Sequence, residues 1–288
     1  MLTDTARLLG TEGASLPAVA AFNVITLEYA EGIVAGAERA GLPVLLSISQ
    51  NAVRFHGSLA PIAAACVALA QAASVGVGLH LDHCDDAELV REAADLGFAS
   101  AMFDASVLPY DRNLEETARV VELGHERNLW IEAELGEIGG KDGAHAFGVR
   151  TDPAEAAAFV AATGVDGLAV AVGTSHAMTS RTAEPDTGLI CRLREAVPVP
   201  LVLHGSSGVA DAALRSAIAA GIRKVNVGTQ LSADFSLALT SQLGESPDPR
   251  PALIAARGSI ADTVDRLLRV ISGPTSASLS KGAPCPQP

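Results

Sequence analysis

The feature that most constrains this chain is a regular alternation of short apolar runs with Ala-rich helical stretches. The expected strands are rich in Val, Leu and Ile and cover residues 18–24, 43–49, 76–82, 100–105, 130–136, 167–173, 200–205 and 224–228. The expected helices lie between them, at residues 27–40, 59–73, 85–96, 113–127, 153–163, 187–196 and 211–220. Strict alternation of apolar strands with helices is typical of a parallel sheet covered by helices. Eight such units favour a closed (β/α)8 or TIM barrel over an open doubly wound sheet.

The size of the chain fits one barrel domain. It has 288 residues, of which 49% are hydrophobic, and a barrel of about 250 residues usually forms one domain. We therefore expect a single domain over residues 1–272, in which two extra helices at 229–243 and 250–271 follow the eighth strand. The Pro- and Ser-rich residues 273–288 are expected to form a disordered tail.

The composition argues against several classes of partner and location. A net charge of −13 disfavours nucleic acid and anionic membrane surfaces as partners. No run of about 18 consecutive apolar residues occurs, so no membrane span is expected. The N-terminal MLTDTARLLG lacks the positively charged start and the apolar stretch of a secretory signal. The four cysteines have no CxxC spacing and are expected to be reduced thiols of a cytoplasmic protein: Cys66, Cys84, Cys191 and Cys285.

Four of the expected strands end at residues that can bind a divalent metal. A parallel barrel gathers the C-termini of all its strands at one mouth, where residues distant in sequence meet. Nitrogen ligands with carboxylate neighbours suit zinc or a similar borderline ion. A single buried His or Asp at a barrel rim can also be a structural group, but three histidines at equivalent positions favour a metal site. The residues concerned are Asp82, His83, Glu132, Glu134, His176 and His204.

The carboxylates on neighbouring strands extend this site. Glu132 and Glu134 share one face of the fifth expected strand, where a carboxylate is costly unless it is paired or metal-bound. Glu134 lies nearer the mouth, so we expect it to be the metal-associated one, and Asp104 ends the fourth strand in the same way. His80 shares a face with Asp82, and we expect it to pack or to support the site from behind.

Two segments are suited to bind a phosphate. In HGSSG, residues 204–208, the glycines let the backbone approach an anion and the serines add hydroxyl donors. In NVGT, residues 226–229, a Gly precedes an expected helix, whose free N–H groups and dipole attract anions. Each motif alone is common, but their positions after strands seven and eight match the usual phosphate site of a (β/α)8 barrel.

Seven segments together resemble the metal-dependent class II ketose-bisphosphate aldolases, and most closely their shorter tagatose/fructose-bisphosphate branch. The segments are AFNVITLE, HLDH, MFDAS, EAELGEIGG, VAVGTSH, LVLHGSSG and KVNVGT, in the right order and spacing from about residue 5 to about residue 270. The resemblance implies an aldolase that cleaves a ketose 1,6-bisphosphate or a related ketose 1-phosphate. The products would be dihydroxyacetone phosphate and an aldehyde, and the enzyme would also catalyse the reverse condensation.

The resemblance also implies roles for the metal-site residues. His83, His176 and His204 would bind the catalytic Zn²⁺ or another divalent ion, while Glu134 and Asp104 would belong to an alternative or second metal position. Asp82 would be the general acid/base at the C4 oxygen. The chemistry agrees, because retro-aldol cleavage needs a Lewis acid on the ketose oxygens to stabilise the enediolate and a carboxylate that takes the hydroxyl proton.

The substrate-binding residues follow from the same resemblance. The dihydroxyacetone phosphate end would be held by Gly205, Ser207, Asn226 and Thr229, and Asn23 and Ser49 would lie near the substrate. A monovalent cation is implied near the phosphate, at the backbone around Gly173 and Gly205. We expect a sugar phosphate as the small-molecule partner and a homodimer or homotetramer as the assembly.

Three departures from the family pattern concern the expected mobile loop, the second metal histidine and the far end of the substrate. Asp142, in Gly139–Gly143, stands where the family has a glutamate, whose side chain is one methylene longer and which transfers the carbon-bound proton. After His176, Ala177 and Thr179 replace the Gly and the aromatic residue that often follow. Arg257 matches a basic position of the family that would bind the phosphate at the far end of a bisphosphate. Ala261 replaces a second position that is often basic, so the sequence does not decide which group the far end of the substrate carries.

Two other classes of function remain at this point. One is a zinc hydrolase on the same barrel, which would use a bound water as nucleophile and would not need two phosphate-binding segments. The other is a non-catalytic sugar-phosphate-binding protein, which would not need to retain Asp82 together with the three histidines. The sequence leaves fructose and tagatose undistinguished, because they differ only in the configuration at C4.

Overall fold

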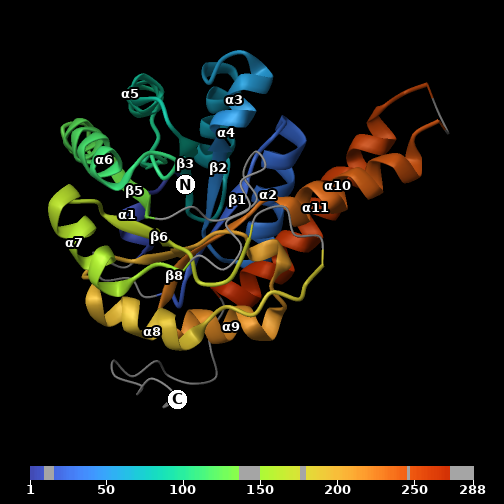
Figure 1. Cartoon of the computed structure of the whole chain (residues 1–288). Coiled ribbons are helices and arrows are strands. Elements are labelled where there is room, and N and C mark those ends of the chain that lie inside the picture. Colours follow the sequence, from blue (N-terminus) through green and yellow to red (C-terminus); the bar gives the residue numbers. More distant parts are fainter. Residues whose placement is uncertain (10–15, 136–149, 176–179, 245–246, 273–288) are drawn as a thin grey trace.

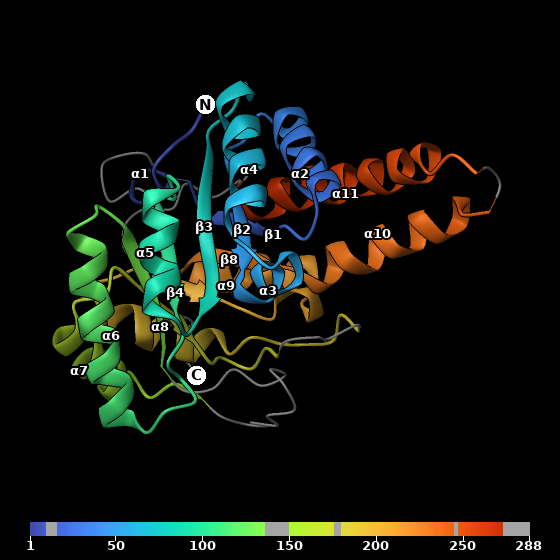
Figure 2. The ribbon, with the colours of Figure 1, turned by 90° about the horizontal axis from the view of Figure 1, so that it is seen from above.

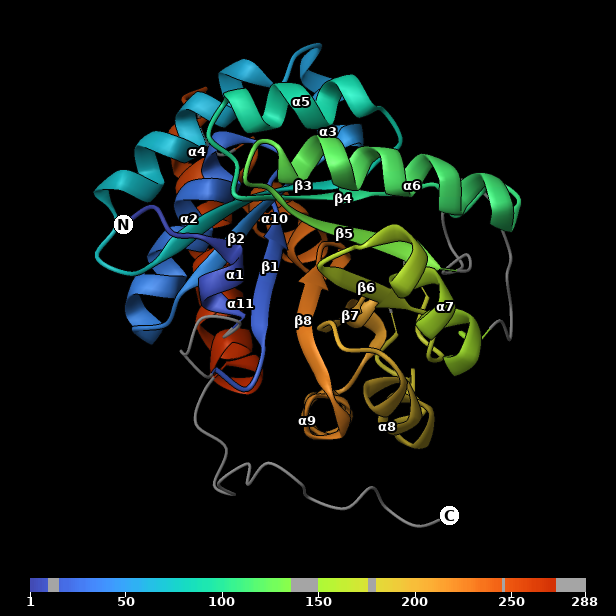
Figure 3. The same cartoon turned by 90° about the vertical axis from the view of Figure 1, so that its left-hand side faces the viewer.

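The computed structural model describes residues 1–9, 16–135, 150–175, 180–244 and 247–272, and in this part of the chain eight parallel strands close into a barrel. The strands follow each other around the ring in sequence order, and the last pairs with the first (Figures 1 and 3). The (β/α)8 prediction is therefore confirmed. The strands are β1 (Val19–Asn23), β2 (Val44–Ser49), β3 (Val77–Cys84), β4 (Ser100–Phe103), β5 (Trp130–Leu135), β6 (Gly167–Val170), β7 (Leu201–Leu203) and β8 (Ile222–Val227).

Helices cover the outside of the barrel, as Figure 3 shows. Their order matches the prediction, with α1, α3 and the short 3-10 turn η1 as additions. The helices are α1 (Thr5–Leu8), α2 (Leu27–Ala40), α3 (Gln50–His56), α4 (Ala60–Ala72), α5 (Ala87–Asp95), α6 (Tyr110–His125), α7 (Pro153–Thr163), α8 (Thr187–Ala196), η1 (Ser206–Gly208), α9 (Asp211–Ala220), α10 (Thr229–Gln242) and α11 (Arg250–Ile271).

Side chains on each strand alternate between the helices and the barrel interior, as the two-residue period of a strand requires. On β1, Ala20 and Phe22 belong to the large cluster beneath the helices, whereas Val19 and Ala21 belong to a smaller cluster inside the barrel. The smaller cluster also contains Leu8 and Leu9, so α1 and the residue after it close the N-terminal end of the barrel.

The barrel interior changes from apolar to polar toward the mouth. Inward-facing residues near the strand starts, such as Leu45 and Trp130, are apolar. Farther along the strands the buried residues are polar or charged: Ser47, His80, Asp82, Glu132, Glu134, Lys224 and Asn226. This polar layer lies beneath the C-terminal strand ends, where the candidate site is found.

Most helix ends carry the expected signals, with two corrections. Asp152 accepts hydrogen bonds from two backbone amides at the start of α7, and Gly41 ends α2 in the left-handed conformation. Helix α5 is capped by Asp86 and begins at Ala87, two residues after the expected start of residues 85–96. Helix α6 begins at Tyr110 rather than at the predicted Asn113, which instead donates to the Glu134 carbonyl at 3.2 Å.

Helices α10 and α11 form a hairpin that extends from the barrel (Figure 2). The base of α11 packs against α2 at two glycines. A Cβ atom at Gly32 would lie 2.8 Å from the Arg257 carbonyl oxygen, and one at Gly36 would lie 2.6 Å from the Ala261 carbonyl oxygen. The two helix backbones can therefore approach this closely only because these positions carry no side chain.

Among the described helices, none is by itself long and apolar enough to cross a bilayer. The joined pair α3 and α4 passes that test by length and composition, with a bend of 115° between its two helices.

We predict that Gly36→Ala destabilises the protein by about 1–3 kcal/mol, because overpacking would push α11 away from α2. Thermal or urea denaturation measures the change. Gly258→Ala on the exposed side of α11 is the matched control, since nothing lies within 4 Å of a Cβ there. It should be neutral or stabilising by about 0.5–1 kcal/mol. Equal stability of the Gly36→Ala variant and the wild type would contradict the close packing.

Candidate active site

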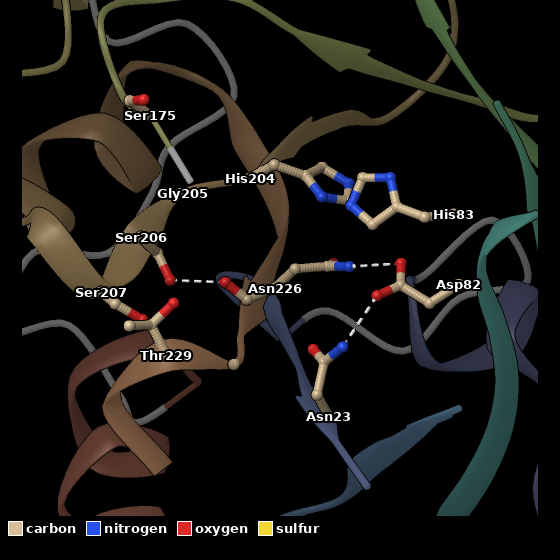
Figure 4. Close-up of a pocket in the computed structure, with 11 residues that line it drawn as sticks. Asn23, Asp82, His83, Ser175, His204, Gly205, Ser206, Ser207, Asn226 and Thr229 are labelled. Carbon is tan, nitrogen blue, oxygen red and sulfur yellow. Dashed lines mark hydrogen bonds between the residues drawn. The ribbon is translucent and has the colours of Figure 1, made fainter. Parts of the chain in front are cut away.

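A cavity of about 160 Å³ opens at the C-terminal mouth of the barrel. The residues that line it come from the ends of β1, β3, β7 and β8 and from the loops that follow β6 and these strands (Figure 4). They are Asn23, Asp82, His83, Ser175, His204, Gly205, Ser206, Ser207, Asn226, Gly228 and Thr229. The cavity therefore lies where the convergence of strand ends predicts it.

The backbone of β3 allows two consecutive residues to face this cavity. Neighbouring side chains of a regular strand point to opposite faces. His83 has φ 46°, a left-handed conformation, and the pairing of β3 with β4 shifts register between Leu81 and Cys84. A non-glycine residue in this conformation costs about 1–3 kcal/mol. This left-handed conformation turns the His83 side chain toward the cavity that Asp82 also faces.

His83 and His204 point toward one another across the cavity, with ring centroids 4.7 Å apart (Figure 4). His83 Nδ1 lies 3.0 Å from Asp104 Oδ2, and His204 Nε2 lies 2.9 Å from Glu132 Oε1. Each ring thus uses one nitrogen for a carboxylate. The other nitrogen, Nε2 of His83 and Nδ1 of His204, is the atom that can bind a metal.

Two groups of potential metal ligands share His83. In the first, one ligand atom each from Asp82, His83 and His204 lie within 4.8 Å of one another. In the second, the same holds for His83, Asp104 and Glu134. The predicted grouping of Asp104 and Glu134 beside the histidines is therefore present. His176 and Asp142 lie outside the described residues.

The donor set fits a divalent cation such as zinc. Imidazole nitrogens and carboxylate oxygens are ordinary zinc ligands. A ligand histidine usually donates its second N–H to a carboxylate, which orients the ring. Asp104 and Glu132 stand in that position for His83 and His204.

Asp82 is held as a buried carboxylate by two amides. Asn23 Nδ2 donates to its Oδ2 and Asn226 Nδ2 to its Oδ1, both at 3.0 Å (Figure 4). Burial alone would raise the pKa of Asp82, but electrostatic interactions with its neighbours, above all His83 and His204, lower the pKa below its usual range. Asp82 is therefore an ionised carboxylate at neutral pH.

Beneath the cavity lies a buried ion pair between Glu132 and Lys224, and Lys224 is not among the residues singled out from the sequence. Lys224 Nζ is 2.7 Å from Glu132 Oε2, and both side chains are fully buried. Nζ is also 2.7 Å from Asn226 Oδ1. A sequence signal for it exists, because Lys224 and Asn226 stand two residues apart on β8 and therefore share its inner face.

His80 borders the ion pair, in the supporting position predicted for it. Its Nε2 is 3.4 Å from Lys224 Nζ, and its Nδ1 is 2.8 Å from Ser100 Oγ. Burial, followed by the charge of Lys224, lowers the pKa of His80 to about 3. His80 is therefore a neutral member of the polar layer at neutral pH.

The opposite wall of the cavity is formed by the turn after β7 and the start of α10. Gly205 has φ 67°, and a Cβ atom there would lie 2.5 Å from the Ser175 carbonyl oxygen. Ser207 Oγ accepts from the Gln230 amide at 3.1 Å, which joins the turn to the first residues of α10. Thr229 begins that helix, where backbone N–H groups favour an anion.

Two predicted substrate residues do not line this cavity. Ser49 pairs in register with Asp82, and its hydroxyl accepts from the Ala52 amide at the start of α3. Arg257 lies on α11 and forms an ion pair with Glu31 at 2.7 Å. Conversely, Ser175 lines the cavity although the sequence did not single it out, and Ser206 and Gly228 line it from within the two predicted phosphate-binding segments.

The fold and the imidazoles, carboxylates and Gly- and Ser-containing turn that cluster at its mouth define an enzyme of the (β/α)8 barrel class. Residues 4–274 match the model of the class-II fructose-bisphosphate aldolases, and the chain belongs to this family. It is therefore a carbon–carbon lyase, rather than the zinc hydrolase or the non-catalytic binding protein left open by the residues alone.

Solved structures agree with this assignment. The YdjI aldolase from Escherichia coli K12 is 31% identical, with a TM-score of 0.84, over 95% of this chain and 98% of that one. A putative fructose-1,6-biphosphate aldolase from Coccidioides immitis is 30% identical, with a TM-score of 0.84, over 93% and 96%. A fructose-bisphosphate aldolase from Campylobacter jejuni, 19% identical over 89% and 90% with a TM-score of 0.73, supports the fold alone.

Proposed function

We propose that this aldolase cleaves a ketose 1,6-bisphosphate of the fructose or tagatose type, or a related ketose 1-phosphate, to dihydroxyacetone phosphate and an aldehyde. It would also catalyse the reverse condensation. The observation that carries the proposal is the convergence of Asp82, His83 and His204 on one cavity whose far wall is the Gly- and Ser-containing turn after β7. Release of dihydroxyacetone phosphate from a panel of ketose phosphates, followed in a coupled assay, tests the proposal and identifies the C4 configuration.

The metal would be held by His83, His204 and the third predicted histidine, His176, which lies outside the described residues. A divalent cation, Zn²⁺ or another, would polarise the ketose carbonyl and hydroxyl oxygens when bound. Asp104 and Glu134 offer the alternative position around His83. Through their contacts with His83 and His204, Asp104 and Glu132 orient the two rings.

Asp82 would move the proton at the C4 oxygen. In cleavage its carboxylate takes the proton from the C4 hydroxyl as the C3–C4 bond breaks, and in condensation it returns that proton. Its ionised state and the two amides that hold it in place support the role of proton acceptor in the cleavage direction. We assign the exchange of the C3 proton of dihydroxyacetone phosphate to Asp142, which lies outside the described residues.

The phosphate of the dihydroxyacetone end would lie against the turn after β7 and the start of α10. Gly205 and Ser207 supply backbone and hydroxyl groups there, and Thr229 opens the helix. Asn226 would contact the same end of the substrate, and Asn23 would lie beside it. A monovalent cation bound to backbone near Gly173 and Gly205 is part of the proposal.

The assembly and the location complete the proposal. We propose a homodimer or homotetramer that works in the cytoplasm on a sugar phosphate. The buried and unbridged thiols of Cys66, Cys84 and Cys191 support a reducing compartment.

His83→Ala and His204→Ala should each remove both bound zinc and cleavage, because the remaining ligands would hold the ion poorly. Metal analysis of the purified protein and the coupled assay measure the two effects. His125→Ala is the control, since His125 lies on the surface of α6 beside Asp166 and should keep both properties. Full activity after exhaustive chelation would contradict the metal site.

Asp82→Ala should keep zinc and lose turnover by about 10²–10⁴-fold, the usual contribution of a positioned acid or base. Steady-state kinetics and metal analysis of the same sample decide the matter. If the variant loses its zinc instead, Asp82 is a structural or ligand residue rather than the acid/base.

Arg257→Ala should raise KM for a bisphosphate ketose if Arg257 exchanges Glu31 for the far phosphate. Loss of one charge-assisted contact costs about 1.5–3 kcal/mol, or roughly 10–100-fold. Binding of dihydroxyacetone phosphate should hardly change. Equal weakening of both ligands would assign Arg257 to the shared phosphate, and no change for either would leave it a partner of Glu31 alone.

A further inference from the structure

We infer that the buried pair of Lys224 and Glu132 positions both His204 and Asp82. Glu132 sets the tautomer of His204, and Lys224 holds the Asn226 amide that donates to Asp82. Lys224 lies on β8 beneath the cavity and is fully buried. An ammonium group has three hydrogens to donate and no acceptor. Its three neighbours are Glu132 Oε2 at 2.7 Å, Asn226 Oδ1 at 2.7 Å and His80 Nε2 at 3.4 Å.

The first branch runs through Glu132 to His204. Glu132 accepts from Lys224 at Oε2, and its Oε1 lies 2.9 Å from His204 Nε2. Because an ionised carboxylate only accepts, the hydrogen between these atoms must be on Nε2. A neutral His204 then carries its lone pair on Nδ1, the nitrogen that faces His83 and the proposed metal. Glu132 is therefore the group that sets the tautomer of His204.

The second branch runs through Asn226 to Asp82. The two ends of an amide are nearly the same size, so only its partners decide which end faces which way. Lys224 can only donate and therefore fixes the Asn226 oxygen toward itself. The Asn226 nitrogen is then directed at Asp82 Oδ1, 3.0 Å away. The Asp82 carboxylate only accepts and favours the same orientation, so the amide is held at both ends, and without Lys224 only its nitrogen end would be held.

The third neighbour holds the ammonium in place. His80 Nε2 faces a donor, and its Nδ1 lies 2.8 Å from the hydroxyl of Ser100. A neutral ring with its hydrogen on Nδ1 satisfies both contacts. Lys224 therefore has an acceptor for each of its hydrogens, and its position is determined on three sides.

A buried ion pair is by itself weak evidence for a contribution to stability, since desolvation offsets much of the attraction. The role inferred for the pair concerns direction rather than stability, and it rests on the metal and acid/base roles proposed above for His204 and Asp82. Removing the two members of the ion pair one at a time should therefore affect different branches, which a purely structural role would not produce.

Glu132→Gln tests the first branch. The oxygen of the new amide side chain would face Lys224, and the NH₂ group of the same amide would then face His204 Nε2. His204 would then have to accept at Nε2 and carry its hydrogen on Nδ1. ¹⁵N chemical shifts of histidine-labelled, metal-free protein at about pH 8, where imidazoles are neutral, report the tautomer, and the His204→Ala spectrum assigns the signal. We expect a change from Nε2–H to Nδ1–H and a loss of zinc affinity of roughly 10–100-fold.

Lys224→Met tests the second branch. The Glu132 carboxylate still accepts from His204, so the Nε2–H tautomer and the wild-type zinc affinity should persist. The Asn226 amide is then held at its nitrogen end alone, its donation to Asp82 becomes less well aligned, and kcat should fall by roughly 10–100-fold. Gly36→Ala is the control for lost stability alone, and it should keep the tautomer, the zinc affinity and kcat.

Each single variant leaves one buried charge without its partner and can fail to fold. The double variant Lys224→Met/Glu132→Gln removes both charges and is the second measurement. Because nothing then orients the new amide, we expect both tautomers of His204 in the metal-free double variant.

Three results would overturn the inference: an unchanged Nε2–H tautomer in Glu132→Gln, wild-type kcat in Lys224→Met, or a single Nε2–H tautomer in the double variant. A wild-type protein that binds no zinc would instead overturn the proposed function. The tautomer is measured without metal, so the two failures can be told apart.

Discussion

The constraint on which this structure depends is the pairing of β1 with β8. Val19 to Phe22 lie in register with Lys224 to Val227, which closes the ring and leaves no strand edge open. The same pairing brings the ends of the first and last strands together, so that Asn23 and Asn226 reach opposite oxygens of Asp82. In an open sheet these two asparagines would lie at opposite edges. The site therefore exists only as a consequence of closure.

Closure also creates the electrostatic problem that the polar layer solves. Charged groups that point into a barrel lose their contact with water, and each isolated charge would cost several kcal/mol. Here the positive charge of Lys224 faces Glu132, while the acidic side chain of Asp82 lies among histidines and amides. These contacts fix side chains in defined orientations before any ligand arrives. Preorganisation of this kind is what allows a small cavity to act on a substrate without rearranging.

Much of the fold could be predicted from the sequence because the strand and helix periods alternate so regularly. The bounds of α2, α7, α8 and α9 agree with the expected ranges, and the strands differ from theirs by a few residues at each end. The four-residue α1 and the seven-residue α3 could not be predicted, because segments this short show no helical period.

The candidate site was predictable in part. The rule that strand ends meet at the mouth located Asp82, His83 and His204, but it did not explain how two neighbours on β3 share one cavity. That depends on the left-handed conformation of His83 and a register shift, neither of which leaves a sequence signal. Lys224 escaped prediction for another reason: the rule selects residues at strand ends, and Lys224 lies one layer below them.

The hydrogen bonds of Asp82 have a consequence for ligand entry, because Asn23 and Asn226 each already donate to one of its two carboxylate oxygens. A carboxylate oxygen can accept more than one hydrogen bond, so a ligand hydroxyl can bind Asp82 without displacing either amide. It must approach from a direction that Asn23 and Asn226 leave open, so the first and last strands of the barrel together set the geometry of that approach.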